Sequence, residues 1–253
     1  MSLRRDIDIE MCVVSQKCHV CLPGGVAVDE AVFLWLNSWN GSSDFFTTVI
    51  PILETIPFKT LPYMMVFWGL WFLGDPSEKR TEVRESLTAA LLCTVPIMLI
   101  TRGMANYMPF SYRPMQTPGF EISVYEGQRV DWPGDFSSMP SDHASLLLGF
   151  SVAIFTIHRT AGTFLILWAI FISSIPRIIL GYHWPSDILV GWFIGAAITL
   201  MLMRPLTRLV TRTGTVPFFE RREVIGYPLL FFATVEFARL FDASRSLAEM
   251  LLS

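Results

Sequence analysis

Apolar runs about as long as a bilayer is thick dominate this chain. Six of them approach the roughly 20 residues that a helix needs to cross a hydrocarbon core. They lie near residues 56–74, 86–104, 143–158, 162–180, 186–203 and 224–241. Of the 253 residues, 52% are hydrophobic and only 16% are charged, where a soluble domain carries roughly a quarter. Because every backbone polar group inside a bilayer must be satisfied internally, the sequence predicts an all-α, polytopic membrane bundle of about six transmembrane helices.

The close succession of these runs favours one membrane-embedded domain over residues 28–253, behind a polar tail at 1–27. Residues 28–53 are interrupted by polar side chains, which predicts an interfacial amphipathic helix and a partly buried segment rather than a clean span. The connection at 105–142 is long and rich in Pro, Gly and acidic residues. Loops of that length are usually functional or disordered, and we expect this one to act as a lid or substrate entry.

The N-terminal tail contains Cys12, Cys18 and Cys21 beside His19. These cysteines do not form two paired Cys-x-x-Cys motifs, so reduced thiols are favoured over a metal cluster there. The chain also lacks the basic run that nucleic acid binding requires, and its net charge of −3 indicates no particular partner. We therefore expect membrane lipids as its surroundings and no nucleic acid, metal or cofactor, while the oligomeric state stays open.

The charged residues in the short connections predict an orientation. Nine basic residues belong to one side: Lys79, Arg80, Arg84, Arg159, Arg204, Arg208, Arg212, Arg221 and Arg222. The connections on the other side, 105–142 and 181–185, contain only Arg113 and Arg129. Under the positive-inside rule the first side is cytoplasmic, so the second faces outward, as the periplasmic side of a bacterial inner membrane would.

Ionisable residues gather at the outward ends of these spans. His183 and Asp187 are four residues apart at a predicted helix start, a spacing that can bring the carboxylate to one ring nitrogen and leave the other as a nucleophile or base. His143 begins another apolar helix, where free backbone N–H groups favour phosphate binding and a histidine can act as a general acid. Arg113 and Arg177 are suited to clamping a phosphate, because a guanidinium meets two oxygens at once.

Each of these residues also has a plain structural interpretation. Ser141, Asp142 or Asp187 can simply cap a helix, and an arginine at a helix end is often a snorkelling anchor. The joint arrangement argues against these separate interpretations, because all of the residues map to one membrane face, where charged groups are expensive and usually functional.

The same segments resemble the three-part signature of the type 2 phosphatidic acid phosphatase superfamily, which includes soluble haloperoxidases and acid phosphatases. The third family motif, Ser-Arg, five residues, His, three residues, Asp, is matched by Arg177, His183 and Asp187, with Pro176 in the serine position. The second, Pro-Ser-Gly-His, is matched by Pro140, Ser141 and His143, with Asp142 in place of glycine. The motif core lies within residues 102–190.

The first motif departs furthest from the family pattern, which is Lys, six residues, Arg-Pro. Arg113-Pro114 matches, but the lysine position is Asn106. Asn106 can donate a hydrogen bond to a phosphate oxygen but supplies no charge. Arg102, one helical turn earlier, could take the place of the lysine. Asp142 places a carboxylate beside the expected phosphate, tolerable if its side chain turns away while its backbone N–H faces the substrate.

The resemblance implies roles for these residues. His183 would attack phosphorus and form a phosphohistidine, Asp187 would orient it, and His143 would protonate the leaving group and then activate water. The phosphoryl oxygens would be held by a second set: Arg113, Arg177, Asn106, Ser141 and the backbone of Asp142. No metal is needed in such a mechanism.

The function that follows is metal-independent hydrolysis of a lipid phosphate or pyrophosphate, with undecaprenyl pyrophosphate as first choice because the site faces outward and the second motif reads Pro-Ser-Asp-His. Phosphatidic acid, phosphatidylglycerophosphate and a lipid A phosphate are alternative substrates. A phosphotransferase using the same intermediate is the main alternative activity, and a non-catalytic membrane partner is a further one.

Overall fold

The computed structural model describes residues 25–73, 78–128, 137–244 and 250; the predicted thiol-containing tail lies outside this part of the chain. The described residues form helices and connections without a strand, which confirms the predicted all-α class. The helices are α2 (Gly25–Asn37), α3 (Asp44–Glu54), α4 (Ile56–Phe72), α5 (Glu78–Tyr107), α6 (Asp142–Ile157), α7 (Arg159–Trp168), α8 (Ile175–Ile179), α9 (Pro185–Thr213), α10 (Thr215–Arg221) and α11 (Glu223–Ala238).

The three longest apolar helical stretches can each cross a membrane by length and hydropathy: Lys79–Tyr107, Arg159–Ile179 and Pro185–Thr213. The second of these joins α7 to α8 through a π-helical turn, η2 (Ala169–Ser174). α9 exposes large apolar side chains along its outer surface, among them Phe193 and Met201, as expected of a lipid-facing helix. The chain is therefore an integral membrane protein, whereas the count of six spans stays a prediction, because α4, α6 and α11 have only 17, 16 and 16 residues.

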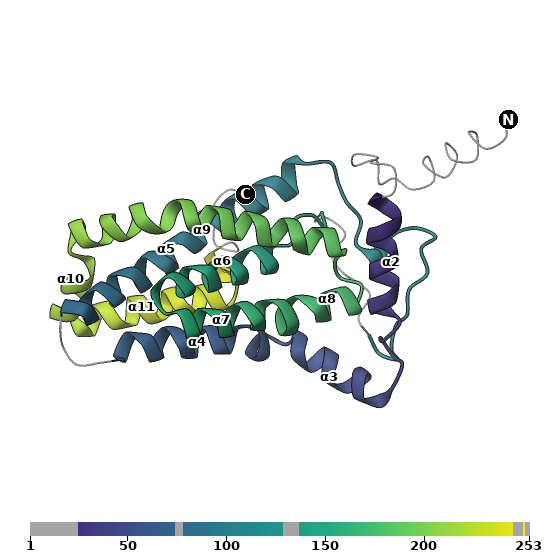
Figure 1. Ribbon diagram of the computed structural model, residues 1–253, viewed down its shortest axis with the longest axis horizontal. Helices are drawn as coiled ribbons and strands as arrows, with labels where there is room; N and C mark the ends of the chain where they lie inside the picture. Colours follow the sequence, from purple (N-terminus) through teal and green to yellow (C-terminus); the bar gives the residue numbers. More distant parts are fainter. Residues whose placement is uncertain (1–24, 74–77, 129–136, 245–249, 251–253) are drawn as a thin grey trace.

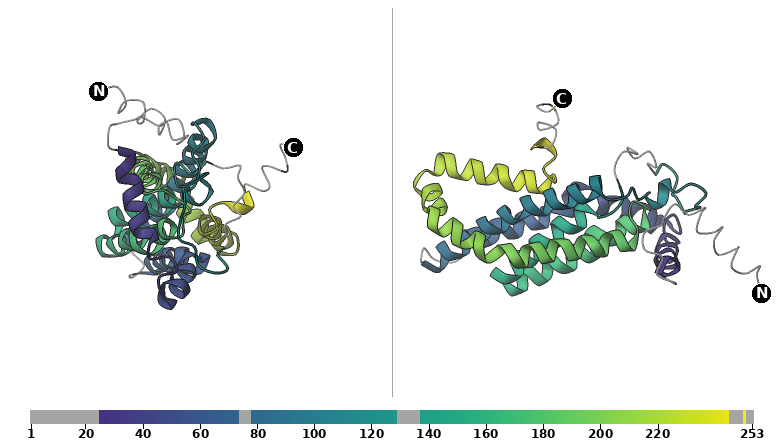
Figure 2. Two further views of the ribbon diagram at one scale, coloured as in Figure 1. Left: turned by 90° about the vertical axis from the view of Figure 1, so that its right-hand side faces the viewer. Right: turned by 90° about the horizontal axis from the view of Figure 1, so that it is seen from above.

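The long helices lie roughly side by side along one axis of the molecule (Figures 1 and 2). α6 lies in the middle, and nine of its 16 residues are buried. α10 lies at one end of the bundle, and α2 runs across the opposite end (Figure 1). The predicted interfacial segment at 28–53 is thus two helices, α2 and α3, both at the end that carries the sequence motifs.

α6 and α9 approach one another closely, and each carries one histidine motif at its start. A Cβ on Gly195 of α9 would lie 2.0 Å from the backbone oxygen of Ser145 in α6, and one on Gly191 would lie 2.7 Å from the oxygen of Ser141. Such distances leave no room for a side chain. The Gly-x-x-x-Gly spacing in α9 therefore lets the two helix backbones touch and fixes the second and third motifs relative to each other.

The described part of the long 105–142 connection is held against the bundle by buried amide side chains. Asn37 in α2 donates to the carbonyl oxygens of Ile179 at 2.7 Å and Ser123 at 3.1 Å. Gln128 donates to the oxygen of Leu180 at 2.8 Å. Since buried polar groups of this kind hold a unique geometry when satisfied, α2 and the connection together support the turn that leads into His183.

Candidate active site

The third motif forms a tight turn between α8 and α9. Gly181 has φ +75°, a conformation that other residues rarely adopt, and it reverses the chain after α8. Asp187, in the first turn of α9, accepts a hydrogen bond from the backbone N–H of Trp184 at 2.8 Å. This cap fixes the carboxylate and the preceding residue together, so that His183 and Asp187 are both buried, 2% and 1% exposed.

The orientation of the His183 ring depends on a residue outside the family motifs. His183 Nδ1 lies 3.0 Å from the backbone oxygen of Ser138 and 3.6 Å from Asp187 Oδ2, and only the first distance is a hydrogen bond. The Ser138 hydroxyl in turn donates to Asp187 Oδ2. Asp187 thus supports His183 through Ser138 and by its charge, rather than by the direct hydrogen bond expected from the spacing.

The other ring nitrogen of His183 meets two arginines. Its Nε2 lies 3.3 Å from Arg113 Nη1 and 3.3 Å from Arg177 Nη2. Guanidinium groups are donors only, so Nε2 must be the acceptor and Nδ1 carries the proton toward Ser138. Burial lowers the pKa of His183 from the ordinary 6.5; Asp187 opposes this shift, and Arg177 and Arg113 add to it. The ring is therefore held neutral, with an unprotonated Nε2 that faces the two guanidinium groups.

The arginine pair is itself fixed from behind. Arg113 donates to the carbonyl oxygen of Tyr182 at 2.8 Å, and Arg177 donates to Glu54 Oε1 at 2.5 Å. Burial lowers the pKa of Arg113 to about 10, with the nearby charge of Arg177 contributing, so the guanidinium stays cationic at neutral pH. Two fixed cations beside one unprotonated imidazole nitrogen form a site that can stabilise a phosphoryl group during attack.

The second motif contributes His143 and Asp142 at the start of α6. Asp142 Oδ1 lies 3.1 Å from His143 Nδ1 and accepts from the backbone N–H of His143 at 2.9 Å. Its other oxygen, Oδ2, lies 2.8 Å from Arg102 Nη2. The carboxylate in the family's glycine position is therefore paired with a cation and a histidine, and it is not left to repel a phosphate.

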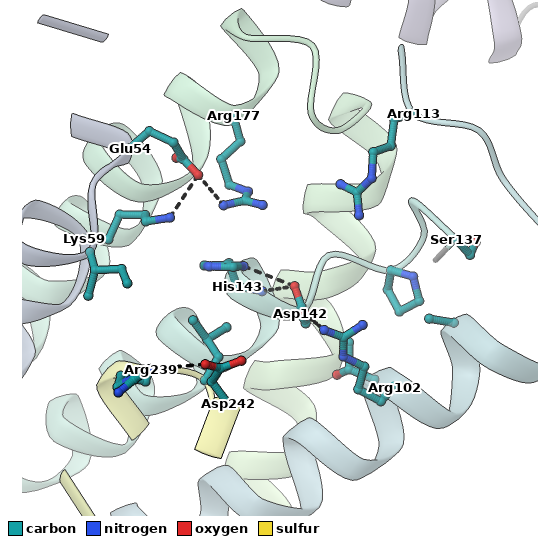
Figure 3. A pocket seen from close by; sticks show the side chains of 15 residues that line it. Glu54, Lys59, Arg102, Arg113, Ser137, Asp142, His143, Arg177, Arg239 and Asp242 are labelled. Carbon is teal, nitrogen blue, oxygen red and sulfur yellow. Dashed lines mark hydrogen bonds and ion pairs between the residues drawn. The ribbon is translucent and has the colours of Figure 1, made fainter. Parts of the chain in front are cut away.

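A cavity of about 350 Å³ joins these groups (Figure 3). Its wall includes Arg113 and Arg177 on one side, with His143 and Asp142 between them and Arg102 (Figure 3). His183 is not part of the wall; it lies behind the two arginines that contact its Nε2. For Nε2 to reach a phosphorus atom, the guanidinium groups must turn from the imidazole to the phosphate oxygens.

Two residues of the predicted phosphate-binding set do not line this cavity. Asn106 is exposed in the last turn of α5, whereas Arg102, one turn earlier, does line it. Residues four apart share a helix face. Arg102 therefore lies on the face of α5 that would carry the missing lysine, one helical turn before the lysine position. Ser141 is buried, and its backbone N–H donates to the backbone oxygen of Asp187 at 3.2 Å. This hydrogen bond links the second motif to the third.

Sequence reasoning missed three other residues of this region. Ser138 supports His183 and Asp187, and Glu54 with Lys59 forms part of the cavity wall. Glu54 and Lys59 lie far from the motifs in the sequence, at the junction of α3 and α4. The available signal was the presence of Glu54 and Lys59 at the ends of otherwise apolar segments, since ionisable residues within a membrane domain indicate a functional site.

Residues 82–210, about half of the chain, match the model of the PAP2 superfamily. This chain belongs to the PAP2 superfamily. The matched range contains all three motifs, so the resemblance stated from the sequence is confirmed. As a PAP2 protein, the chain is a lipid phosphatase, an enzyme of the hydrolase class.

Three curated relatives are similar to this PAP2 protein over more than half of its length. "Lipid A 1-diphosphate synthase" of Escherichia coli (strain K12) is 34% identical over 73% of this chain and 79% of its own length. "Putative undecaprenyl-diphosphatase YbjG" of the same organism is 23% identical over 65% of this chain and 76% of its own. "Bacitracin transport permease protein BcrC" of Bacillus licheniformis is 26% identical over 60% and 70%. Among solved structures, LpxE of Aquifex aeolicus matches 70% of this chain and 95% of its own at 14% identity, with a TM-score of 0.44.

Proposed function

We propose that this PAP2 protein cleaves a lipid diphosphate, with undecaprenyl pyrophosphate as the first choice, at the outer face of a bacterial inner membrane and through a phosphohistidine on His183. The single observation that carries the proposal is the contact of the unprotonated His183 Nε2 with two buried arginines, 3.3 Å from each. A neutral, oriented imidazole beside two fixed cations is what nucleophilic attack on a phosphate requires.

The first step is attack of His183 Nε2 on the terminal phosphorus while the bond to the bridging oxygen breaks. Arg113 and Arg177 turn from the imidazole to the phosphoryl oxygens, where negative charge collects. His143, which lines the cavity, donates a proton to the leaving oxygen. In the second step His143 accepts a proton from water, which attacks the phosphohistidine and releases phosphate.

The outward orientation is supported by where the basic residues lie. α10, the C-terminal half of α9 and the start of α5, which together contain seven of the nine basic residues, lie at the end of the bundle opposite α2 and the motif turn (Figure 1). By the positive-inside rule that end belongs in the cytoplasm. The cavity then lies on the periplasmic side, where the head group of a lipid in the outer leaflet can reach it.

A phosphotransferase is the second candidate, favoured by the 34% identity to a lipid A 1-diphosphate synthase. Such an enzyme would use the same phosphohistidine but pass the phosphoryl group to a lipid phosphate instead of water. Water must lose a proton to His143 as it attacks phosphorus, whereas an ionised lipid phosphate can attack through an oxygen that carries no proton.

One experiment tests the proposal and separates the two activities. The purified protein is given undecaprenyl pyrophosphate labelled with ³²P at the terminal phosphate, with and without lipid A, and the label is followed. Release as inorganic phosphate in both conditions supports the hydrolase, and label on lipid A supports the phosphotransferase. No turnover of this substrate, with turnover of phosphatidic acid, phosphatidylglycerophosphate or a lipid A phosphate, would refute the first-choice substrate.

A further inference from the structure

Lys59, outside the residues that match the family, lies in the wall of the active-site cavity. It belongs to the first turns of α4 and is only 6% exposed. Lysine is almost never buried to this degree unless it is paired. Its Nζ donates to Glu54 Oε1 at 2.9 Å, which leaves further N–H donors of the ammonium for another acceptor.

Glu54 holds two cations with one oxygen. Its Oε1 accepts from Lys59 Nζ and also from Arg177 Nη1 at 2.5 Å. Its other oxygen, Oε2, is buried without a hydrogen-bond partner among the described residues, an arrangement that is unfavourable for a buried carboxylate. A carboxylate placed for stability would use both oxygens, so this arrangement indicates that Glu54 fixes the position of Lys59 relative to Arg177.

The cavity wall carries more positive than negative side chains, an excess that can bind more than one phosphate. Five cationic side chains line it, against three carboxylates. The cationic ones are Lys59, Arg102, Arg113, Arg177 and Arg239, and the carboxylates are Glu54, Asp142 and Asp242. Arg113 and Arg177 are already committed to the phosphoryl group next to His183, so a second anionic group would meet the remaining cations.

The position of Lys59 matches the leaving side of the reaction. Its charge acts on His143 and on Asp142 as well as on Arg177, and Figure 3 shows it on the Glu54 side of the pocket next to His143. It therefore lies close to the histidine that would protonate the leaving oxygen, whereas Arg113 lies across the pocket from it (Figure 3).

We propose that Lys59 binds the lipid-side phosphate of a lipid diphosphate and that Glu54 is its positioning residue. The inference rests on the proposed function. As His183 Nε2 bonds to the terminal phosphorus, the bond from that phosphorus to the bridging oxygen breaks and its electron pair stays on the lipid monophosphate. That oxygen takes the proton of His143, and the ammonium of Lys59 neutralises the charge that grows on the same phosphate. An acceptor lipid phosphate, in the phosphotransferase case, would enter the same position.

The test compares two substrates that differ only in what leaves. A short polyprenyl diphosphate leaves a charged phosphate, whereas p-nitrophenyl phosphate leaves a stable phenolate that needs no cation. The ratio of kcat/KM for the diphosphate to kcat/KM for the aryl phosphate should fall about tenfold or more in Lys59→Met, the factor that corresponds to losing one charge-assisted hydrogen bond of about 1.4 kcal/mol. Lys59→Arg should keep the ratio within about threefold, because it keeps the charge.

Lys79→Met, at the exposed start of α5, is the matched control and should leave both rates unchanged. An unchanged ratio in Lys59→Met, whether both rates fall equally or neither falls, would overturn the inference. Glu54→Gln supplies a second variant if Lys59→Met does not fold: it should raise the KM for the diphosphate several-fold, and an unchanged KM counts against the inference. A wild-type protein that cleaves the aryl phosphate but no diphosphate refutes the proposed function instead.

Discussion

Arg102 and Asp142 form an ion pair of 2.8 Å between α5 and the start of α6. Both occupy places where this chain departs from the family motifs: Asp142 replaces a glycine, and Arg102 lies one turn before the position of the missing lysine. The two departures therefore compensate each other, since the arginine neutralises the carboxylate that would otherwise repel a phosphate.

The pair predicts a coupled mutational response. Arg102→Ala should lower kcat/KM about tenfold or more, because Asp142 is then left uncompensated beside the substrate. Asp142→Gly in the same protein should restore part of the loss, with a coupling energy of roughly 0.5–3 kcal/mol in the double-mutant cycle. Additive effects would show that the two side chains act independently.

His183→Ala should abolish turnover by at least several orders of magnitude, in line with the removal of nucleophiles in other enzymes. Denaturation in alkali during turnover of ³²P-labelled substrate should trap label on the wild-type protein and none on this variant, because the P–N bond of phosphohistidine survives alkali and is hydrolysed by acid. His143→Ala, with an aryl phosphate that needs no general acid, should instead accumulate labelled protein because hydrolysis of the intermediate slows. Label on His183→Ala would assign the nucleophile elsewhere.

The pH dependence should report the protonation of His183. Burial lowers the pKa of His183 below 6.5, and the neutral form is the nucleophile, so kcat/KM should stay high as the pH falls to 6.5 and drop only below it. Asp187 raises this pKa, so in Asp187→Asn the acid limb should move to lower pH even as the rate falls. A limb that stays in place would belong to another group.

Residue 106 should matter little. Asn106 is exposed and does not line the cavity, so both Asn106→Leu and Asn106→Lys should keep kcat/KM within about twofold, as surface substitutions away from a site usually do. This prediction differs from the expectation from the sequence, in which the Asn106 amide donates a hydrogen bond to a phosphate oxygen. A large loss in Asn106→Leu alone would show that this side chain turns into the cavity when lipid binds.

The contact of α6 with α9 predicts a stability difference between two glycines. Gly195→Ala would place a Cβ 2.0 Å from a backbone oxygen of α6, so the helices must separate, at a cost of typically 1–3 kcal/mol. Gly69→Ala in α4 meets nothing within 4 Å and should be neutral or slightly stabilising. Thermal unfolding in detergent should separate the two variants, and similar Tm values would contradict the close contact.

The helical class, the approximate positions of the apolar helices and the family could all be predicted from the amino-acid sequence. Hydrophobic run length and motif spacing are local properties of the chain, so the predicted runs and the observed α4, α5, α6, α9 and α11 agree to within several residues at most ends. The two histidines and two arginines were identifiable for the same reason: the motifs fix their chemistry and their order.

The contacts between side chains from different helices could not be predicted from the sequence and became apparent in the folded structure. Ser138, in the long connection, contacts His183 and Asp187. Glu54, at the end of α3, binds both Lys59 of α4 and Arg177 of α8. Neither contact has a fixed sequence spacing, because each depends on how closely the helices pack and at what height they meet. For the same reason the sequence did not show that Arg102, and not Asn106, lines the cavity. The two residues are one helical turn apart in α5, and that distance decides whether a side chain lies inside the cavity or beyond its rim.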